Sequence, residues 1–141
     1  MNRAARFAAA YAVLMPAHDL ADHVVQTDRQ ANGKAGPGWA GARAMAGHVG
    51  GYHLVQLLAL LALRLLGVRP SWRRTAAAVS VSAGTHALLD RRWPVQAILR
   101  ATRSPGFAGM TTPLHGGYLA DQALHHGVLV VCAAVLAGGR R

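Results

Sequence analysis

The stretch AARFAAAYAVLMPAHDLADHVVQ, residues 4–26, begins as an alanine-rich apolar run and ends in a polar passage. His18, Asp22 and Gln26 stand four residues apart, a spacing that places side chains on one face of a helix. Ionisable groups that follow an apolar helix need a charge partner, a bound ligand or a water-filled cavity. The stretch therefore predicts a helix whose last turns carry a row of interacting polar groups.

Composition indicates one domain of a membrane protein. The 141 residues suit a single core. Of these residues, 52% are hydrophobic and only 14% are charged, a charged share well below that of soluble domains. We expect one integral-membrane helical domain over residues 1–141, which crosses the cell membrane several times and has the lipid bilayer as a partner.

Four apolar segments follow one another along the chain, at about 4–26, 44–66, 75–90 and 118–137. They predict an all-α fold, a four-helix up-down-up-down transmembrane bundle. Between helices 3 and 4 we expect a short interfacial helix that begins near Trp93. The uninterrupted apolar runs are shorter than the roughly 20 residues that span a bilayer, so a soluble alanine-rich bundle is the alternative.

Basic residues give a net charge of +10 and little information on orientation. Eight of the fifteen lie on the side of the termini and the second loop: Arg3, Arg6, Arg64, Arg69, Arg73, Arg74, Arg140 and Arg141. The positive-inside rule then slightly favours cytoplasmic termini. The charge would also suit a basic DNA-binding regulator, but no helix shows a recognition face, and nucleic acid is not an expected partner.

The polar residues of the four segments gather at one end of the predicted bundle. They occur late in the first and third segments and early in the second and fourth, and these positions meet when neighbouring helices alternate in direction. The candidate metal ligands are His18, Asp22, His48, His86, Asp90, Asp121 and His125. The residues expected to support these ligands or contact a substrate are Gln26, Gln122 and His23.

Three His/Asp pairs in this set are four residues apart, so each pair occupies one helix face. Neutral imidazole and carboxylate form a common ligand set for zinc, and also for manganese, iron or magnesium. A zinc site is the leading interpretation, and a purely structural polar network is the alternative.

Several of these motifs, taken together, resemble an uncharacterised bacterial membrane-protein family, domain of unknown function 3307. The resemblance rests on H-x-x-x-D-x-x-x-Q-T at residues 18–27, Lys34, His48, THALLD at 85–90 and DQALHH at 121–126. It departs from the family at His23, where an aromatic or aliphatic residue is usual. The resemblance implies a small membrane protein with several spans. A broader similarity to membrane-bound metal-dependent hydrolases suggests hydrolysis.

Two functional hypotheses follow. The first is a metal-dependent hydrolase that holds one or two divalent ions and acts on an amphiphilic or phosphate-containing substrate. Arg91 and Arg92 would attract the anionic lipid or other amphiphile, although arginines at helix ends more often serve only as anchors at the membrane surface. The second is a non-enzymatic membrane protein, either a metal or proton carrier or a helper that binds a partner, with a buried His/Asp network. The sequence gives no indication of oligomeric state.

Overall fold

The computed structural model describes residues 1–138, and in this range it is helical with no strand. The all-α prediction is therefore confirmed. Arg140 and Arg141, which entered the charge comparison, lie outside the described residues. The elements are α1 Arg3–Leu20, the π-helical turn η1 Ala21–Val25, α2 Asp28–Gly33, α3 Gly38–Leu65, α4 Trp72–Leu89, α5 Trp93–Ala101, α6 Pro105–Gly109 and α7 Gly116–Ala137.

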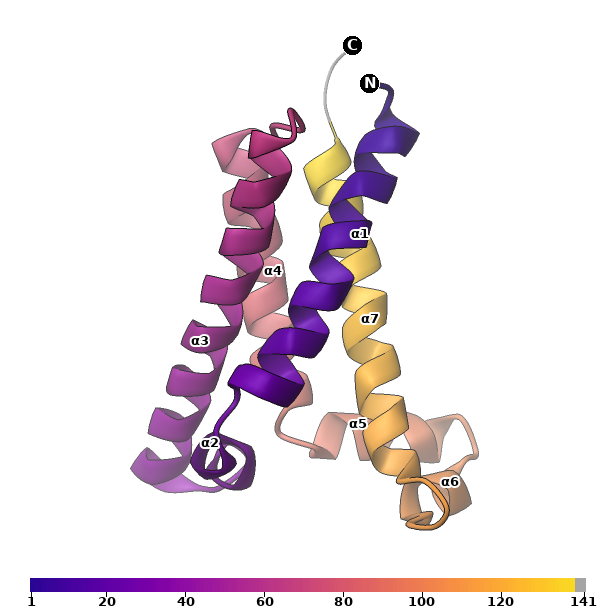
Figure 1. Cartoon of the computed structure of the whole chain (residues 1–141). Helices are drawn as coiled ribbons and strands as arrows, with labels where there is room; N and C mark the ends of the chain where they lie inside the picture. Colours follow the sequence, from indigo (N-terminus) through magenta and orange to yellow (C-terminus); the bar gives the residue numbers. More distant parts are fainter. Residues whose placement is uncertain (139–141) are drawn as a thin grey trace.

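The four long helices, α1, α3, α4 and α7, run side by side and alternate in direction (Figure 1). Helix α1 packs against α3 and α7, and α4 packs against the same two helices. The short helices α5 and α6 lie across one end of this bundle, the end at which α1 and α4 finish (Figure 1). We call it the site end.

Local sequence explains the irregular segment at the site end. The π-helical turn closes with a hydrogen bond from the backbone N–H of Gln26 to the carbonyl of Ala21. Thr27 and Gln30 then form a capping box that starts α2, a helix that the sequence did not lead us to expect. Their side chains satisfy the first N–H groups of the new helix, and the chain can turn sharply after α1.

The apolar core fills the half of the bundle away from the site end. Its buried members come from all four long helices: Ala10, Leu14, Leu60, Leu63, Ala78, Leu129, Cys132, Ala133 and Leu136. The buried polar side chains lie nearer the site end. The bundle is thus divided along its length into an apolar half and a polar half.

Within residues 1–138, two of the four long helices, α3 and α7, are long and apolar enough to cross a membrane. Helices α1 and α4 do not combine sufficient length and hydropathy, so the prediction of four membrane-spanning helices is not supported. In α4 the cause is the sequence WRRTAAAVSVSAGTH, in which hydroxyl and charged groups dilute small apolar residues. Helix α1 owes its apolar character mainly to alanine and carries Arg3, Arg6 and His18.

Candidate metal centre

Four donor atoms converge where α1 and α4 end beside α3. They are Asp22 Oδ1, His48 Nε2, His86 Nε2 and Asp90 Oδ2, and we call these four residues the primary site. The two imidazole nitrogens lie 2.8 Å apart. Asp22 Oδ1 lies 3.2 Å from His48 Nε2 and 3.4 Å from His86 Nε2. Asp90 Oδ2 lies 3.1 and 3.3 Å from the same two nitrogens.

The four nitrogen–oxygen separations, 3.1–3.4 Å, fit a shared divalent cation, whereas the 2.8 Å between the two imidazole nitrogens is a hydrogen-bond distance that binding of a cation would have to widen. In a tetrahedral site with ligand distances of about 2.0–2.1 Å, neighbouring ligand atoms are about 3.3 Å apart. Asp22 Oδ1 and Asp90 Oδ2 are buried and accept no hydrogen bond, although imidazole nitrogens lie close to both. A buried polar atom without a partner costs about 1–3 kcal/mol. A cation at the centre of the four atoms would satisfy both oxygens.

The two carboxyl groups of the primary site are ionised at neutral pH. Asp22 lies in the π-helical turn after α1, Asp90 directly follows the last residue of α4, and both are buried. Burial alone would raise the pKa of each carboxyl. The adjacent imidazoles of His48 and His86 and the charge of Lys34 outweigh burial and hold both pKa values well below the usual range. Lys34 Nζ, at the end of α2, lies 2.8 Å from Asp90 Oδ1 and 3.2 Å from His48 Nε2.

His18 is close to the primary site, but both of its nitrogens have other partners. Its Nε2 lies 2.9 Å from Gln122 Oε1, which can only accept, so this nitrogen carries the proton in the neutral ring. Its Nδ1 then accepts from the Tyr52 hydroxyl at 3.0 Å. Gln56 Nε2 donates to the Tyr52 oxygen at 2.9 Å and to the carbonyl of Leu14 at 3.2 Å. A buried hydrogen-bond chain therefore holds His18 in place.

Gln122 connects this chain to two carboxylates. Its Nε2 lies 3.5 Å from Asp22 Oδ2 and 3.3 Å from Asp121 Oδ2. Asp121 and His125 stand one turn apart on α7, and His125 Nδ1 lies 3.6 Å from Asp121 Oδ2. The structure thus places these two predicted ligands beside the primary site, and a ring nitrogen of His125 also lies within 4.8 Å of ligand atoms of Asp22 and His86.

The remaining predicted residues lie around this centre. Gln26 Nε2 donates to the backbone carbonyl of Asp22 at 2.9 Å, which fixes the turn that presents the carboxylate. His23 Nδ1 donates to the carbonyl of Asp19 at 2.9 Å, and His23 Nε2 lies 2.6 Å from the Tyr118 hydroxyl. His23 therefore joins the end of α1 to the start of α7 at an exposed position.

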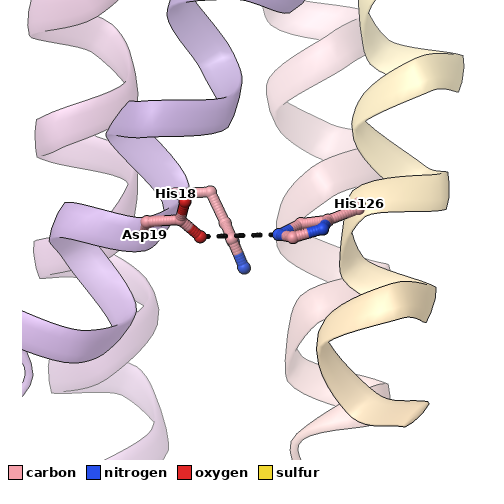
Figure 2. A group of neighbouring side chains, drawn as sticks. All are labelled: His18, Asp19 and His126. Carbon is pink, nitrogen blue, oxygen red and sulfur yellow. Dashed lines mark ion pairs between the residues drawn. The ribbon is translucent and has the colours of Figure 1, made fainter. Parts of the chain in front are cut away.

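A further His/Asp group lies on the outer side of α1 and α7, away from the four convergent atoms. Figure 2 shows the ion pair between Asp19 and His126, with His18 next to it. The pair spans 3.4 Å, and its side chains are 53% and 31% exposed. Because His18 uses both nitrogens elsewhere, this group lacks the three convergent, available donors that the primary site has.

A cavity of about 780 Å³ reaches the site from the side of α5 and α6. Asp22, Asp90 and Asp121 contribute to its wall, together with Lys34 and Arg92. Its apolar wall comes from Val95, Leu99, Met110, Pro113, Leu114 and Leu119. The cavity is therefore lined by charged side chains in one part and by apolar side chains in another, an arrangement that suits an amphiphilic ligand.

The sequence did not identify the chemical roles of Lys34, Tyr52 and Gln56. Lys34 was noted only as part of the family resemblance, because a lysine in a predicted loop shows no helical spacing to other polar residues. Tyr52 and Gln56 continue the four-residue spacing that begins at His48, so the sequence did contain a signal for them on α3.

Comparisons with protein-family models, curated proteins and solved structures found no significant match. The family resemblance remains a prediction.

Proposed function

We propose that the protein is an integral membrane protein that holds a zinc ion at the primary site and hydrolyses an anionic amphiphile there. The observation that carries the proposal is the convergence of two imidazole nitrogens and two carboxylate oxygens, with five separations between 2.8 and 3.4 Å. Two nitrogen and two oxygen ligands, without a thiolate, form a set that zinc accepts and that manganese or iron would also accept.

The exposed surface supports a membrane location. Helix α3 carries a row of exposed leucines in its C-terminal half, Leu54, Leu57, Leu58, Leu61 and Leu65. Exposed tryptophans stand at both ends of the bundle: Trp39 and Trp93 at the site end, and Trp72 at the start of α4. Tryptophan is enriched at the two membrane interfaces. In a soluble bundle these exposed leucines and tryptophans would contact water, which does not stabilise the fold.

Helices α1 and α4 would enter the membrane together with α3 and α7, because all four pack along one another. At 18 residues each, α1 and α4 are about 27 Å long, close to the roughly 30 Å of a bilayer core. Some of their small residues, Ala10 and Ala17 in α1 and Ala78 and Ser82 in α4, are buried in the bundle, which is the usual role of alanine, glycine and serine in membrane bundles. In this proposal the primary site lies near one membrane interface, with α5 along that interface.

The cavity supports the substrate class. A divalent ion at the primary site would supply Lewis-acid activation of water and of a phosphoryl or acyl oxygen. Arg92 lines the cavity. Within residues 1–138 its guanidinium donates to the carbonyl of Ala31 at 3.4 Å and forms no ion pair, so its charge is available to an anionic group. The apolar wall formed by Leu99, Leu114 and Leu119 would accept an aliphatic chain and exclude water.

The carrier hypothesis receives less support. A carrier needs polar groups along the whole path of its ion. Beyond Gln56, the bundle is filled by the apolar core, with Leu60, Leu63, Leu129 and Leu136 all buried. The convergent donors at one end favour a site that retains its ion.

The test is elemental analysis of detergent-purified protein and of two histidine variants. The wild type should contain one zinc ion per chain. His86→Ala removes one of four ligands and should lower zinc affinity by more than 100-fold, since changes that only disturb ligand orientation already cost about 10–100-fold.

His53→Ala is the matched control. His53 is also a buried helical histidine, and its Nδ1 bonds only to the carbonyl of Val49 on its own helix. This variant should keep its zinc. A wild type without metal would overturn the proposal, and so would a His86→Ala protein that binds as much zinc as His53→Ala.

A further inference from the structure

A second set of potential metal ligands adjoins the primary site. A carboxylate oxygen of Asp121, a ring nitrogen of His125 and a carboxylate oxygen of Asp90 all lie within 4.8 Å of one another. His125 is only 3% exposed. The Asp121 side chain is 22% exposed and lines the cavity. The set thus combines a buried imidazole, a carboxylate that faces the cavity and a carboxylate shared with the primary site.

The helix backbone prepares His125 to bind a metal. Its Nδ1 lies 2.9 Å from the backbone carbonyl of Asp121, an acceptor, so Nδ1 carries the ring proton. The lone pair is therefore on Nε2, which is buried and has no hydrogen-bond partner. Metal-bound histidines commonly donate their other nitrogen to a carbonyl in this way, and the bond fixes the tautomer. A cation would satisfy the otherwise unpaired Nε2.

Charge balance indicates how a second ion would bind. With neutral imidazoles, the carboxylates of Asp22, Asp90 and Asp121 and the ammonium of Lys34 sum to −2. One divalent ion at the primary site neutralises this charge. A second ion would leave an excess of +2, so it would bind more weakly and together with an anion from the cavity.

We propose that Asp121 and His125, with Asp90 as the shared ligand, hold a second divalent ion that binds the anionic group of the substrate. This inference rests on the proposed function, because it assumes a metal at the primary site. The second ion would be Mn²⁺, a transition-metal ion that accepts an imidazole nitrogen together with carboxylate and water oxygens. The open cavity beside Asp121 provides room for the waters and for a phosphate oxygen.

The test titrates zinc-loaded, detergent-purified protein with Mn²⁺, with and without inorganic phosphate, and measures free Mn²⁺ by electron paramagnetic resonance. The wild type should bind one Mn²⁺ per chain in addition to zinc, and phosphate should tighten the binding. Asp121→Asn keeps the side-chain volume and should weaken Mn²⁺ binding by about tenfold or more, while its zinc content stays at one ion.

Asp19→Asn is the matched control, because Asp19 pairs with His126 on the outer surface and should not affect either ion. The retained zinc of Asp121→Asn also reports that the variant is folded. A zinc-loaded wild type that binds no Mn²⁺ overturns the second site and leaves the first intact, and so does an unchanged Mn²⁺ affinity in Asp121→Asn. A wild type that binds no zinc overturns the proposed function itself.

Discussion

Replacement of Tyr52 by phenylalanine tests the hydrogen-bond chain that holds His18. The Tyr52 ring is 2% exposed and lies against the imidazole of His86, with ring centroids 4.0 Å apart. Phenylalanine preserves this packing and removes only the hydroxyl group. Gln56 keeps its bond to the carbonyl of Leu14, but His18 Nδ1 loses its donor in a side chain that is 0% exposed.

The expected cost is the desolvation of one buried acceptor, about 1–3 kcal/mol. The loss of the Gln56 bond adds little, because the same nitrogen retains Leu14 as a partner. We therefore expect Tyr52→Phe to lower the free energy of unfolding by about 2 kcal/mol, and to leave zinc content unchanged, since Tyr52 supplies no ligand.

The assay is equilibrium unfolding in detergent, with zinc measured on the same samples. Tyr11→Phe is the control: no hydrogen bond of the Tyr11 hydroxyl occurs within the described chain, and its ring stacks on Phe7. This variant should unfold like the wild type. If Tyr52→Phe matched Tyr11→Phe in stability, the assignment of His18 to a buried hydrogen-bond chain would be refuted.

Three further outcomes are expected. The apparent zinc affinity should fall as the pH decreases from about 7 to 5, because imidazole ligands must be neutral. The primary-site carboxyls have lowered pKa values, so their contribution to zinc binding is complete above about pH 4 and is lost only at lower pH; a zinc affinity that is the same at pH 7 and pH 5 would contradict imidazole ligation. Gly41→Ala would push its Cβ into the carbonyl of Gly36, whereas a Cβ at Gly50 meets nothing within 4 Å. In thermal unfolding, Gly41→Ala should therefore have a lower Tm than the control variant Gly50→Ala. Leu58→Arg, on the exposed face of α3, should reduce membrane insertion by about 2.5–3.5 kcal/mol, and Leu65→Arg, at the helix end, by much less; equal recovery of both in the membrane fraction would count against a lipid-facing α3.

Much of the fold follows from hydropathy. The apolar segments at 4–26, 44–66, 75–90 and 118–137 correspond to the four long helices. This agreement is expected, because the length of an apolar segment and the spacing of its apolar residues indicate a helix that packs in a core. The π-helical turn and α2 could not be predicted in this way. They depend on the capping box at Thr27 and Gln30, a local signal that is weak beside the stronger pattern of α1.

Only part of the candidate metal site could be predicted from the sequence. Four-residue spacing places His86 and Asp90 on one helix face, and both contribute to the primary site. The same spacing joins His18 to Asp22, yet their closest contact is 3.8 Å and His18 bonds to Tyr52 instead. Spacing reports which side chains share a face. It does not report which neighbour on another helix competes for a ring nitrogen.

We expect one metal ion to lie among Asp22, His48, His86 and Asp90. The most direct measurement is an anomalous-difference map from crystals of the zinc-loaded protein, with data collected on both sides of the zinc absorption edge. We expect one strong peak within about 2.0–2.2 Å of His48 Nε2, His86 Nε2 and the two carboxylates. The absence of a peak among these four residues, or a peak only beside Asp19 and His126, would contradict this expectation.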